Sequence, residues 1–383
     1  MKPDAFLALE DGTVYRGFSC GAPVDRLGEV VFNTGMTGYE EVLTDPSYAG
    51  QIVTFTVPEL GNTGFNRADR ESAAIHASGM ICRDLNPPSS WRSEEPLSDV
   101  LRRAGIPAIS GIDTRSLTLR LRSGGTLKAR ICCSGSETPE AAIAAARAWT
   151  GLDGQDYASA VTCPAPYDWP LAPAPPAPQA LPDGFAGAPA PSSTSPLVAV
   201  LDFGVKYNTL RALAALGARV RVFPAKTPAA DILAARPDGV LLSNGPADPA
   251  ALPYAVQTIR DLLGKLPIMG ICLGHQLLAI TLGAKTARLP FGHHGCNHPV
   301  KNLTDGTVEI TSQNHNFVVV ADTLDPTIAT ITHRSLNDNS VEGLSAPTLR
   351  AFSLQYHPEA APGPHDATPS FVRFVRSLRP EMT

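Results

Sequence analysis

The 383-residue chain has no Cys-x-x-Cys pair, and its seven cysteines are scattered and odd in number. A disulfide scaffold is therefore not expected, and the composition fits a reducing compartment such as the cytoplasm. No apolar run reaches the roughly 18 residues of a membrane-spanning helix, so no membrane segment is expected. Asp4, Glu10 and Asp11 interrupt the short apolar start, which argues against a signal peptide.

The chain also lacks an excess of charge of one sign. It has 31 Lys and Arg against 36 Asp and Glu, which gives a formal charge of −5. This balance excludes a generally basic nucleic-acid binder. Hydrophobic residues make up 43% of the chain and charged residues 17%, so the chain is expected to fold. At about 100–200 residues per domain, its length allows two or three domains.

Proline is concentrated in one segment. Residues 164–196 contain 11 prolines among Ala, Ser and Gly, with almost no charge. Such a segment cannot bury a core, and proline has no amide donor for a helix or sheet. We therefore predict a semi-extended connector over 164–196 between an N-terminal domain (1–163) and a C-terminal domain (197–383). A polyproline ligand for a partner domain is the alternative.

The N-terminal domain has mixed signals. Residues 30–32 and 51–57 are rich in β-branched side chains and predict strands, whereas 141–149 predicts a short helix. Dense turn chemistry lies between such segments. A mixed α/β domain is expected, and the sequence does not define its topology.

The C-terminal domain has a clearer rhythm. The apolar run 197–201 predicts a strand that is buried on both faces. Further strands are expected at 219–223, 239–242 and 267–271, and helices at 209–216, 228–235, 252–263 and 273–282. This alternation predicts an α/β fold with a doubly wound, mostly parallel sheet. Beyond Thr286 we expect antiparallel strands, and a last helix over 366–378.

Functional sites in such sheets lie at the carboxyl ends of the strands. One of these ends reads Gly270-Ile271-Cys272-Leu273-Gly274, the form of a nucleophile elbow. Amides at the start of the following helix favour a thiolate, and the N–H of Leu273 is a candidate oxyanion donor. The alternative is that Cys272 is an ordinary buried residue.

A cysteine nucleophile needs a base and a group that orients the base. His275 is a candidate only through proximity, whereas His357 ends a predicted strand and shares one face of the extended chain with Glu359. The loop at 243–246 offers the N–H of Gly245 as a second oxyanion donor. The alternatives are that His357 is a surface histidine beside an acidic residue and that the loop at 243–246 is an ordinary turn. Together these groups predict acyl transfer through a thioester, with hydrolysis of an amide or ester.

Three motifs resemble those of class I glutamine amidotransferases: Gly-Ile-Cys-Leu-Gly-His-Gln at 270–276, Ser-Asn-Gly-Pro at 243–246 and His-Pro-Glu at 357–359. Essentially the whole chain, apart from the proline-rich connector, resembles the glutaminase (small) subunit of carbamoyl-phosphate synthase, and the N-terminal motifs are the more specific ones. The segments that carry this second resemblance are 32–39, 43–48, 111–115, 201–206, 291–294, 297–301 and 362–366.

The resemblance implies a flavodoxin-like amidotransferase domain that hydrolyses L-glutamine to glutamate and ammonia. Cys272 would be the nucleophile, His357 the base and Glu359 its orienting group. The ammonia would travel by an internal route to a large subunit, a heterodimer partner that uses ATP and bicarbonate to make carbamoyl phosphate for arginine and pyrimidine synthesis. The chain itself would hold no cofactor, because ATP and Mg would bind the large subunit.

The resemblance also assigns the glutamine contacts, and at two of them this sequence departs from the family pattern. Ala247 replaces a glycine of the usual Asn-Gly-Pro-Gly-Asp-Pro loop, and Asn316 replaces the glycine of Asn-His-Gly-Phe. Contacts made by the backbone tolerate such changes if the dihedral angles allow them. The assigned contacts are Ser47, Gly245, Ala247, Leu273, Gln276, Asn314, Asn316 and Phe317.

The sequence also allows three other interpretations. His293, His294, Cys296 and His298 match no usual zinc spacing, so no metal site is expected. Within the enzyme class, the alternative is another cysteine-dependent amide hydrolase, such as a free-standing peptidase, which would leave the N-terminal domain without a role. Outside it, the alternative is a glutaminase-dead interaction subunit, against which the intact Cys272 argues.

Overall fold

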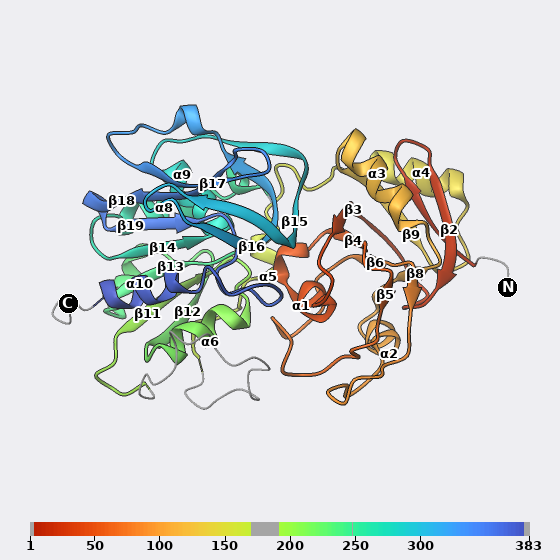
Figure 1. The fold of residues 1–383 in the computed structure, drawn as a ribbon, viewed down its shortest axis with the longest axis horizontal. Helices are drawn as coiled ribbons and strands as arrows, with labels where there is room; N and C mark the ends of the chain where they lie inside the picture. The colour runs from red at the N-terminus through yellow and green to blue at the C-terminus, as the bar shows by residue number, and fades with distance from the viewer. Residues whose placement is uncertain (1–3, 170–190, 247, 379–383) are drawn as a thin grey trace. The chain divides into compact units, whose positions relative to one another are not determined.

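The computed structural model describes residues 4–169, 191–246 and 248–378. It divides into two compact units, Met1–Gln155 with Pro290–Gly295, and Asp156–Leu289 with Cys296–Thr383. Both can be followed along the ribbon in Figure 1. In the described part, no helix is both long enough and apolar enough to span a bilayer.

The second unit is built on a ten-stranded sheet of the order β10-β12-β11-β13-β14-β19-β18-β17-β15-β16 among the described residues. Strands β12, β11, β13, β14 and β19 pair in parallel, and β19, β18, β17 and β15 pair antiparallel. The predicted parallel sheet with later antiparallel strands is therefore confirmed. The strands are β10 Tyr167–Asp168, β11 Leu197–Asp202, β12 Arg219–Pro224, β13 Gly239–Leu242, β14 Ile268–Ile271, β15 Thr286–Asn302, β16 Val308–Val319, β17 Thr330–Ser335, β18 Val341–Ala346 and β19 Ala351–Leu354.

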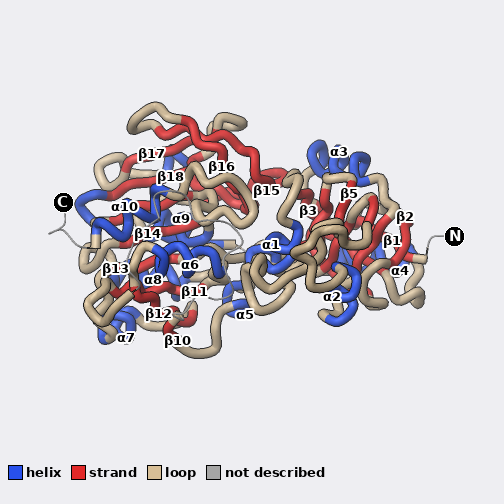
Figure 2. The backbone as a smooth tube through the Cα atoms, turned by 60° about the horizontal axis from the view of Figure 1, so that its bottom comes forward, coloured by secondary structure: helices blue, strands red, loops and turns tan. Residues whose placement is uncertain are grey.

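Helices cover both faces of this sheet, because side chains alternate along each buried strand. Val198 and Val200 of β11 pack with α6 and α10, while Ala199 and Leu201 pack with α8 and α9. Figure 2 distinguishes these helices, in blue, from the strands in red. The helices are α5 Ala158–Val161, α6 Tyr207–Ala215, α7 Ala229–Ala234, α8 Pro253–Leu262, α9 Leu273–Thr281 and α10 Pro369–Ser377.

The first unit contains a closed barrel of the order β1-β2-β8-β6-β4-β3-β9, in which β9 also pairs with β1. One core cluster joins a face of β1, β3, β4, β6, β8 and β9 to α3, and a second packs α1 and α2 on other strand residues. The elements are β1 Ala5–Leu9, β2 Val14–Ser19, β3 Asp25–Asn33, α1 Tyr39–Thr44, β4 Gln51–Phe55, β5 Glu59–Leu60, β6 Gly79–Ile81, β7 Asp84–Leu85, α2 Leu97–Arg103, β8 Ala108–Ser110, α3 Thr114–Gly124, β9 Leu127–Cys132 and α4 Pro139–Ala148.

The second unit begins before the predicted connector, at Asp156 rather than after it. The reason is that residues following α5 hydrogen-bond to the end of β11: the Thr162 hydroxyl donates to the carbonyl oxygen of Asp202 at 2.6 Å, and the Cys163 N–H to its carboxylate at 2.7 Å. Strand β10, inside the predicted connector, pairs with β12. The connector's residues 170–190 lie outside the described residues.

Candidate active site

Four neighbouring parallel strands bring the predicted catalytic residues of the second unit, and Lys206, to one edge of the sheet. Strand β14 ends directly before Cys272, β13 directly before the loop 243–246, and β19 shortly before His357. Strand β11, between β12 and β13, leads into Lys206. Since the strands are parallel, their carboxyl ends meet, and residues distant in sequence come together.

Cys272 occupies a strained turn between β14 and α9. Its φ is 51° and its ψ −104°, a conformation that a residue with a side chain rarely adopts. The residue is 2% exposed, and its thiol donates to the carbonyl oxygen of Asn314 at 3.5 Å. The predicted strand, turn and helix around the cysteine are thus present.

The two glycines of the elbow are required by close backbone contact. A Cβ atom on Gly274 would lie 2.2 Å from the carbonyl oxygen of Leu242, and one on Gly270 would lie 2.7 Å from the carbonyl oxygen of Gly274. Both distances are far shorter than van der Waals contact. Only glycine therefore lets α9 start this close to β13 and β14.

His357 and Glu359 form a buried pair. The Nδ1 of His357 lies 2.7 Å from the Oε1 of Glu359, and both residues are nearly inaccessible to solvent. Burial alone would lower the pKa of His357, but the Glu359 carboxylate and the Cys272 sulfur outweigh burial and raise it to about 10. The other ring nitrogen, Nε2, is buried and hydrogen-bonds to no described residue. The structure therefore brings Cys272, His357 and Glu359 together.

Lys206 supports this pair and was not among the predicted site residues. Its Nζ lies 3.3 Å from the Oε1 of Glu359, in a place where both side chains are buried, and it also donates to the carbonyl oxygen of Ala360. Burial would raise the pKa of Glu359, but the charges of Lys206 and His357 lower it to about 2. A signal was present in the sequence, since Lys206 closes the segment 201–206 that follows a predicted strand.

The loop after β13 is tied to its neighbours. The Ser243 hydroxyl accepts from the Phe203 N–H at 2.9 Å, and its carbonyl accepts from the Gly274 N–H at 3.1 Å. A Cβ atom on Gly245 would lie 2.2 Å from the carbonyl oxygen of Phe203, so the loop packs directly on backbone. The oxyanion role of the Gly245 and Leu273 amides stays a prediction.

The other predicted glutamine contacts of this unit lie on α9 and β16. Asn314, Asn316 and Phe317 are consecutive or nearly so on β16, and all three are buried. The Gln276 amide nitrogen donates to the carbonyl oxygen of Phe317 at 2.8 Å, which joins the helix to the strand. Asn316 lies within extended strand, so a glycine is not needed there for backbone reasons.

The remaining candidates fall elsewhere. Ser47 belongs to the first unit, where it is buried and its N–H donates to Asp45 at 2.9 Å. Ala247 lies outside the described residues. His275 points to Ser353, with Nδ1 and Oγ 2.9 Å apart, and burial lowers its pKa to about 3. His275 is therefore a neutral core residue.

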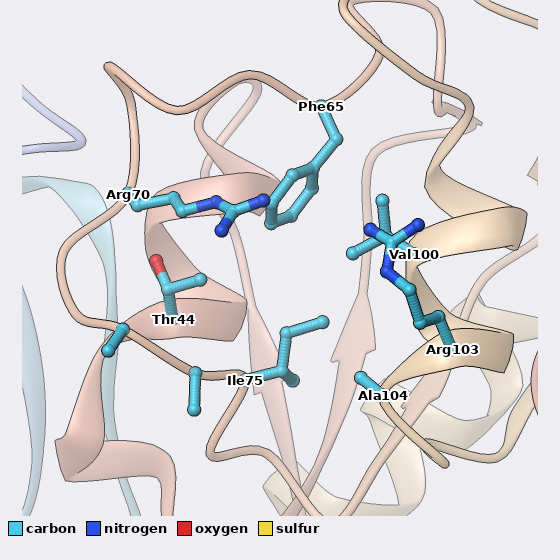
Figure 3. Close-up of a pocket in the computed structure, with 9 residues that line it drawn as sticks. Thr44, Phe65, Arg70, Ile75, Val100, Arg103 and Ala104 are labelled. Carbon is cyan, nitrogen blue, oxygen red and sulfur yellow. The ribbon is translucent and has the colours of Figure 1, made fainter. Parts of the chain in front are cut away.

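A cavity of about 290 Å³ in the first unit, drawn in Figure 3, is lined by none of the predicted site residues. The guanidinium of Arg70 lies over the Phe65 ring, 4.9 Å from its centroid. Arg103 approaches from the other side and is held by Glu95 through two contacts of 2.7 Å. The two arginines thus share one carboxylate, from which the Nη2 of Arg70 is 3.9 Å distant.

The chain is similar to known protein families and to individual known proteins. Residues 199–377 match the family model "Glutamine amidotransferase class-I", and residues 7–131 match "Carbamoyl-phosphate synthase small chain, CPSase domain". The chain is 51% identical to the carbamoyl phosphate synthase small chain of Thioalkalivibrio sulfidiphilus, over 98% of each chain. It is also 51% identical to that of Thermosynechococcus vestitus, over 99% of this chain and 97% of the relative. A solved glutamine amidotransferase of Thermotoga maritima is 22% identical, with a TM-score of 0.34, over 43% of this chain and 76% of that one.

Proposed function

The chain belongs to the carbamoyl phosphate synthase small chain family and is a glutamine-hydrolysing amidotransferase subunit, and we propose that it acts on L-glutamine through a thioester on Cys272. The observation that supports this most is the buried imidazole of His357, held between the Glu359 carboxylate and the Cys272 sulfur. This is the arrangement that cysteine-dependent acyl transfer needs.

In the first half-reaction, the Cys272 sulfur attacks the side-chain carboxamide carbon of glutamine. The raised pKa of His357 keeps its imidazole protonated at neutral pH. The attacking form of the nucleophile is the Cys272 thiolate, which this imidazolium faces. The backbone N–H groups of Leu273 and Gly245 stabilise the oxyanion of the tetrahedral intermediate. The C–N bond then breaks, His357 gives its proton to the leaving nitrogen, and ammonia and a glutamyl thioester result.

In the second half-reaction, the neutral imidazole of His357 takes a proton from a water molecule. That water attacks the thioester carbonyl carbon, the C–S bond breaks, and glutamate leaves with the sulfur again as thiolate. Glu359 accepts a hydrogen bond from Nδ1 in both steps and stabilises the imidazolium. Lys206 keeps Glu359 ionised in its buried place.

The ammonia is the product that the partner uses. The family name implies a large subunit, and we propose that ammonia passes to it by an internal route for carbamoyl phosphate synthesis in the arginine and pyrimidine pathways. ATP and Mg would bind that subunit, and this chain would need no cofactor of its own. A cytoplasmic complex fits these substrates.

The nucleophile is tested by the variant Cys272→Ser. We expect glutamine hydrolysis to fall to background, whereas the variant in complex with its large subunit still makes carbamoyl phosphate from free ammonia. Cys163→Ser is a matched control in the same unit and should keep both activities. Ordinary glutamine-dependent synthesis by Cys272→Ser would refute the assignment, and loss of ammonia-dependent synthesis would indicate a damaged complex.

A further inference from the structure

A second cavity, of about 370 Å³, lies in the second unit between β16, β17, β19 and α10. Phe352, Tyr356 and the imidazole of His333 form aromatic walls, with the rings of His333 and Tyr356 edge to face at 5.8 Å between centroids. A cavity of this size and character fits a small ligand. Cys272 is not in its lining, so it is distinct from the site of glutamine hydrolysis.

One end of this cavity is acidic. Asp305 and Glu309 line it, and the carboxylate of Asp366 lies close enough to act on Glu309. Burial, followed by the charges of Asp366 and Asp305, raises the pKa of Glu309. The hydrogen-bond donors that described residues offer these carboxyls are all neutral: the Tyr356 hydroxyl at 2.9 Å to Glu309, Thr307 and Asn302 to Asp305, and a backbone N–H to Asp366.

The opposite charge comes from α10. The Arg373 guanidinium lies 4.4 Å from the centroid of the Phe352 ring and, within the described part of the chain, forms no ion pair or hydrogen bond. The Ser370 hydroxyl, one turn earlier, is buried and has no hydrogen-bond partner there either. His333 adds no charge, because burial and the nearby Arg373 lower its pKa to about 4.

We propose that this cavity binds a small zwitterion with one ammonium and one carboxylate, such as a free amino acid. The ammonium would lie among the carboxyls of Asp305 and Glu309, which form no ion pair with a lysine or arginine among the described residues. The carboxylate would lie on Arg373, whose guanidinium suits a two-point contact, with the Ser370 hydroxyl beside it. The aromatic walls would cover the apolar stem. The site goes beyond the proposed hydrolysis of glutamine.

Matched ligands test the two-charge requirement. Isothermal titration of the full chain would use L-norvaline and 5-aminopentanoate, isomers that place the two charges close together or far apart, with pentanoate and pentylamine as single-charge probes. We expect one of the isomers to bind saturably and at least tenfold more tightly than each single-charge probe. The proposal is overturned if either single-charge probe binds as tightly as the better isomer, or if neither isomer binds saturably.

Variants locate the site. Arg373→Gln changes an exposed side chain and is expected to weaken zwitterion binding at least tenfold, whereas Arg376→Gln on the same helix is the control and keeps it. Binding that survives in Arg373→Gln belongs to another place, the glutamine site included, and refutes the assignment. These titrations do not depend on hydrolysis, so a negative result leaves the glutaminase proposal standing. Likewise, if Cys272→Ser kept its glutaminase activity, the proposed zwitterion site would be unaffected.

Discussion

At the scale of single residues, the charge of Glu359 decides the protonation of His357. In Glu359→Gln the burial that lowers the pKa of His357 remains, but the attraction that raises it to about 10 is largely lost. We expect kcat/KM for glutamine hydrolysis to fall by roughly 10²–10⁴-fold. Because the variant imidazolium loses its proton at lower pH, the basic limb of the pH–rate profile should move to lower pH. Profiles of both proteins measure this.

A control separates this effect from a general loss of charge. Glu140→Gln, which changes an exposed side chain on α4 of the first unit, should leave the profile unchanged. If the basic limb of the Glu359→Gln profile lay at the same pH as that of the parent protein, the Glu359 carboxylate would not set the pKa of His357.

Lys206 is the second residue-scale prediction. The pair Lys206–Glu359 is 3% and 0% exposed, so Lys206→Met leaves a buried carboxylate without its main cation. Breaking such a pair costs about 3–5 kcal/mol. We expect a lower free energy of unfolding and weak glutaminase activity, measured by urea denaturation and ammonia release. Lys265→Met, which changes an exposed lysine, is the control, and equal stability of the two variants would contradict the role assigned to Lys206.

The triad residues and Lys206 show what sequence can and cannot predict about a site. Cys272 carries a local signal, because a cysteine between two glycines at the end of a strand is typical of a nucleophile elbow. His357 and Glu359 are two residues apart, so their shared face follows from extended backbone. Lys206 is about 150 residues from Glu359, and only the adjacency of strand ends in the folded sheet brings them within 3.3 Å.

At the scale of elements, the elbow depends on the packing of α9 against β13. In Gly274→Ala the new methyl would meet the carbonyl oxygen of Leu242 at 2.2 Å, and backbone cannot yield as a flexible side chain does. We expect a loss of about 1–3 kcal/mol in stability, as for an overpacked core, and a displaced Cys272 with reduced activity. Thermal unfolding and glutamine hydrolysis measure the two effects.

Gly124→Ala is the matched control for this variant. Gly124 ends α3, and a Cβ atom there would meet nothing within 4 Å. Alanine also favours a helix more than glycine does, so this variant should be neutral or slightly stabilising. If both substitutions destabilised the protein equally, close backbone contact at Gly274 would not explain the effect.

The two units differ in how well their elements are predicted. The strands expected at 197–201, 219–223, 239–242 and 267–271 are confirmed to within a residue or two at each end. A continuous apolar run such as 197–201 marks a strand buried on both faces, whereas β12 alternates arginine and valine and is only half buried. In the barrel of the first unit the sequence indicates only two strands, at 30–32 and 51–57, and β3 and β4 confirm them. The barrel strands β6 and β8 have three residues each, and closure depends on pairings between strands far apart in sequence, such as β1 with β9.

At the scale of the whole molecule, the proposed transfer of ammonia needs a second chain. Ammonia released into solvent is lost to the synthase, so uncoupled hydrolysis is wasteful. We expect the isolated chain to hydrolyse glutamine slowly and its complex with the large subunit to do so much faster. Ammonia release from the chain alone and from the complex, at equal concentrations, checks this, and full turnover without the partner would contradict it.

Closure of the barrel has a consequence for how the first unit meets other proteins. A sheet whose last strand pairs with its first has no outermost strand, so the barrel offers no full-length edge to which a foreign strand could add. Recognition by this barrel must therefore run through side chains and loops. In the described sheet of the second unit the outermost strands are β10, of two residues, and β16, so templated misassembly there falls chiefly to β16.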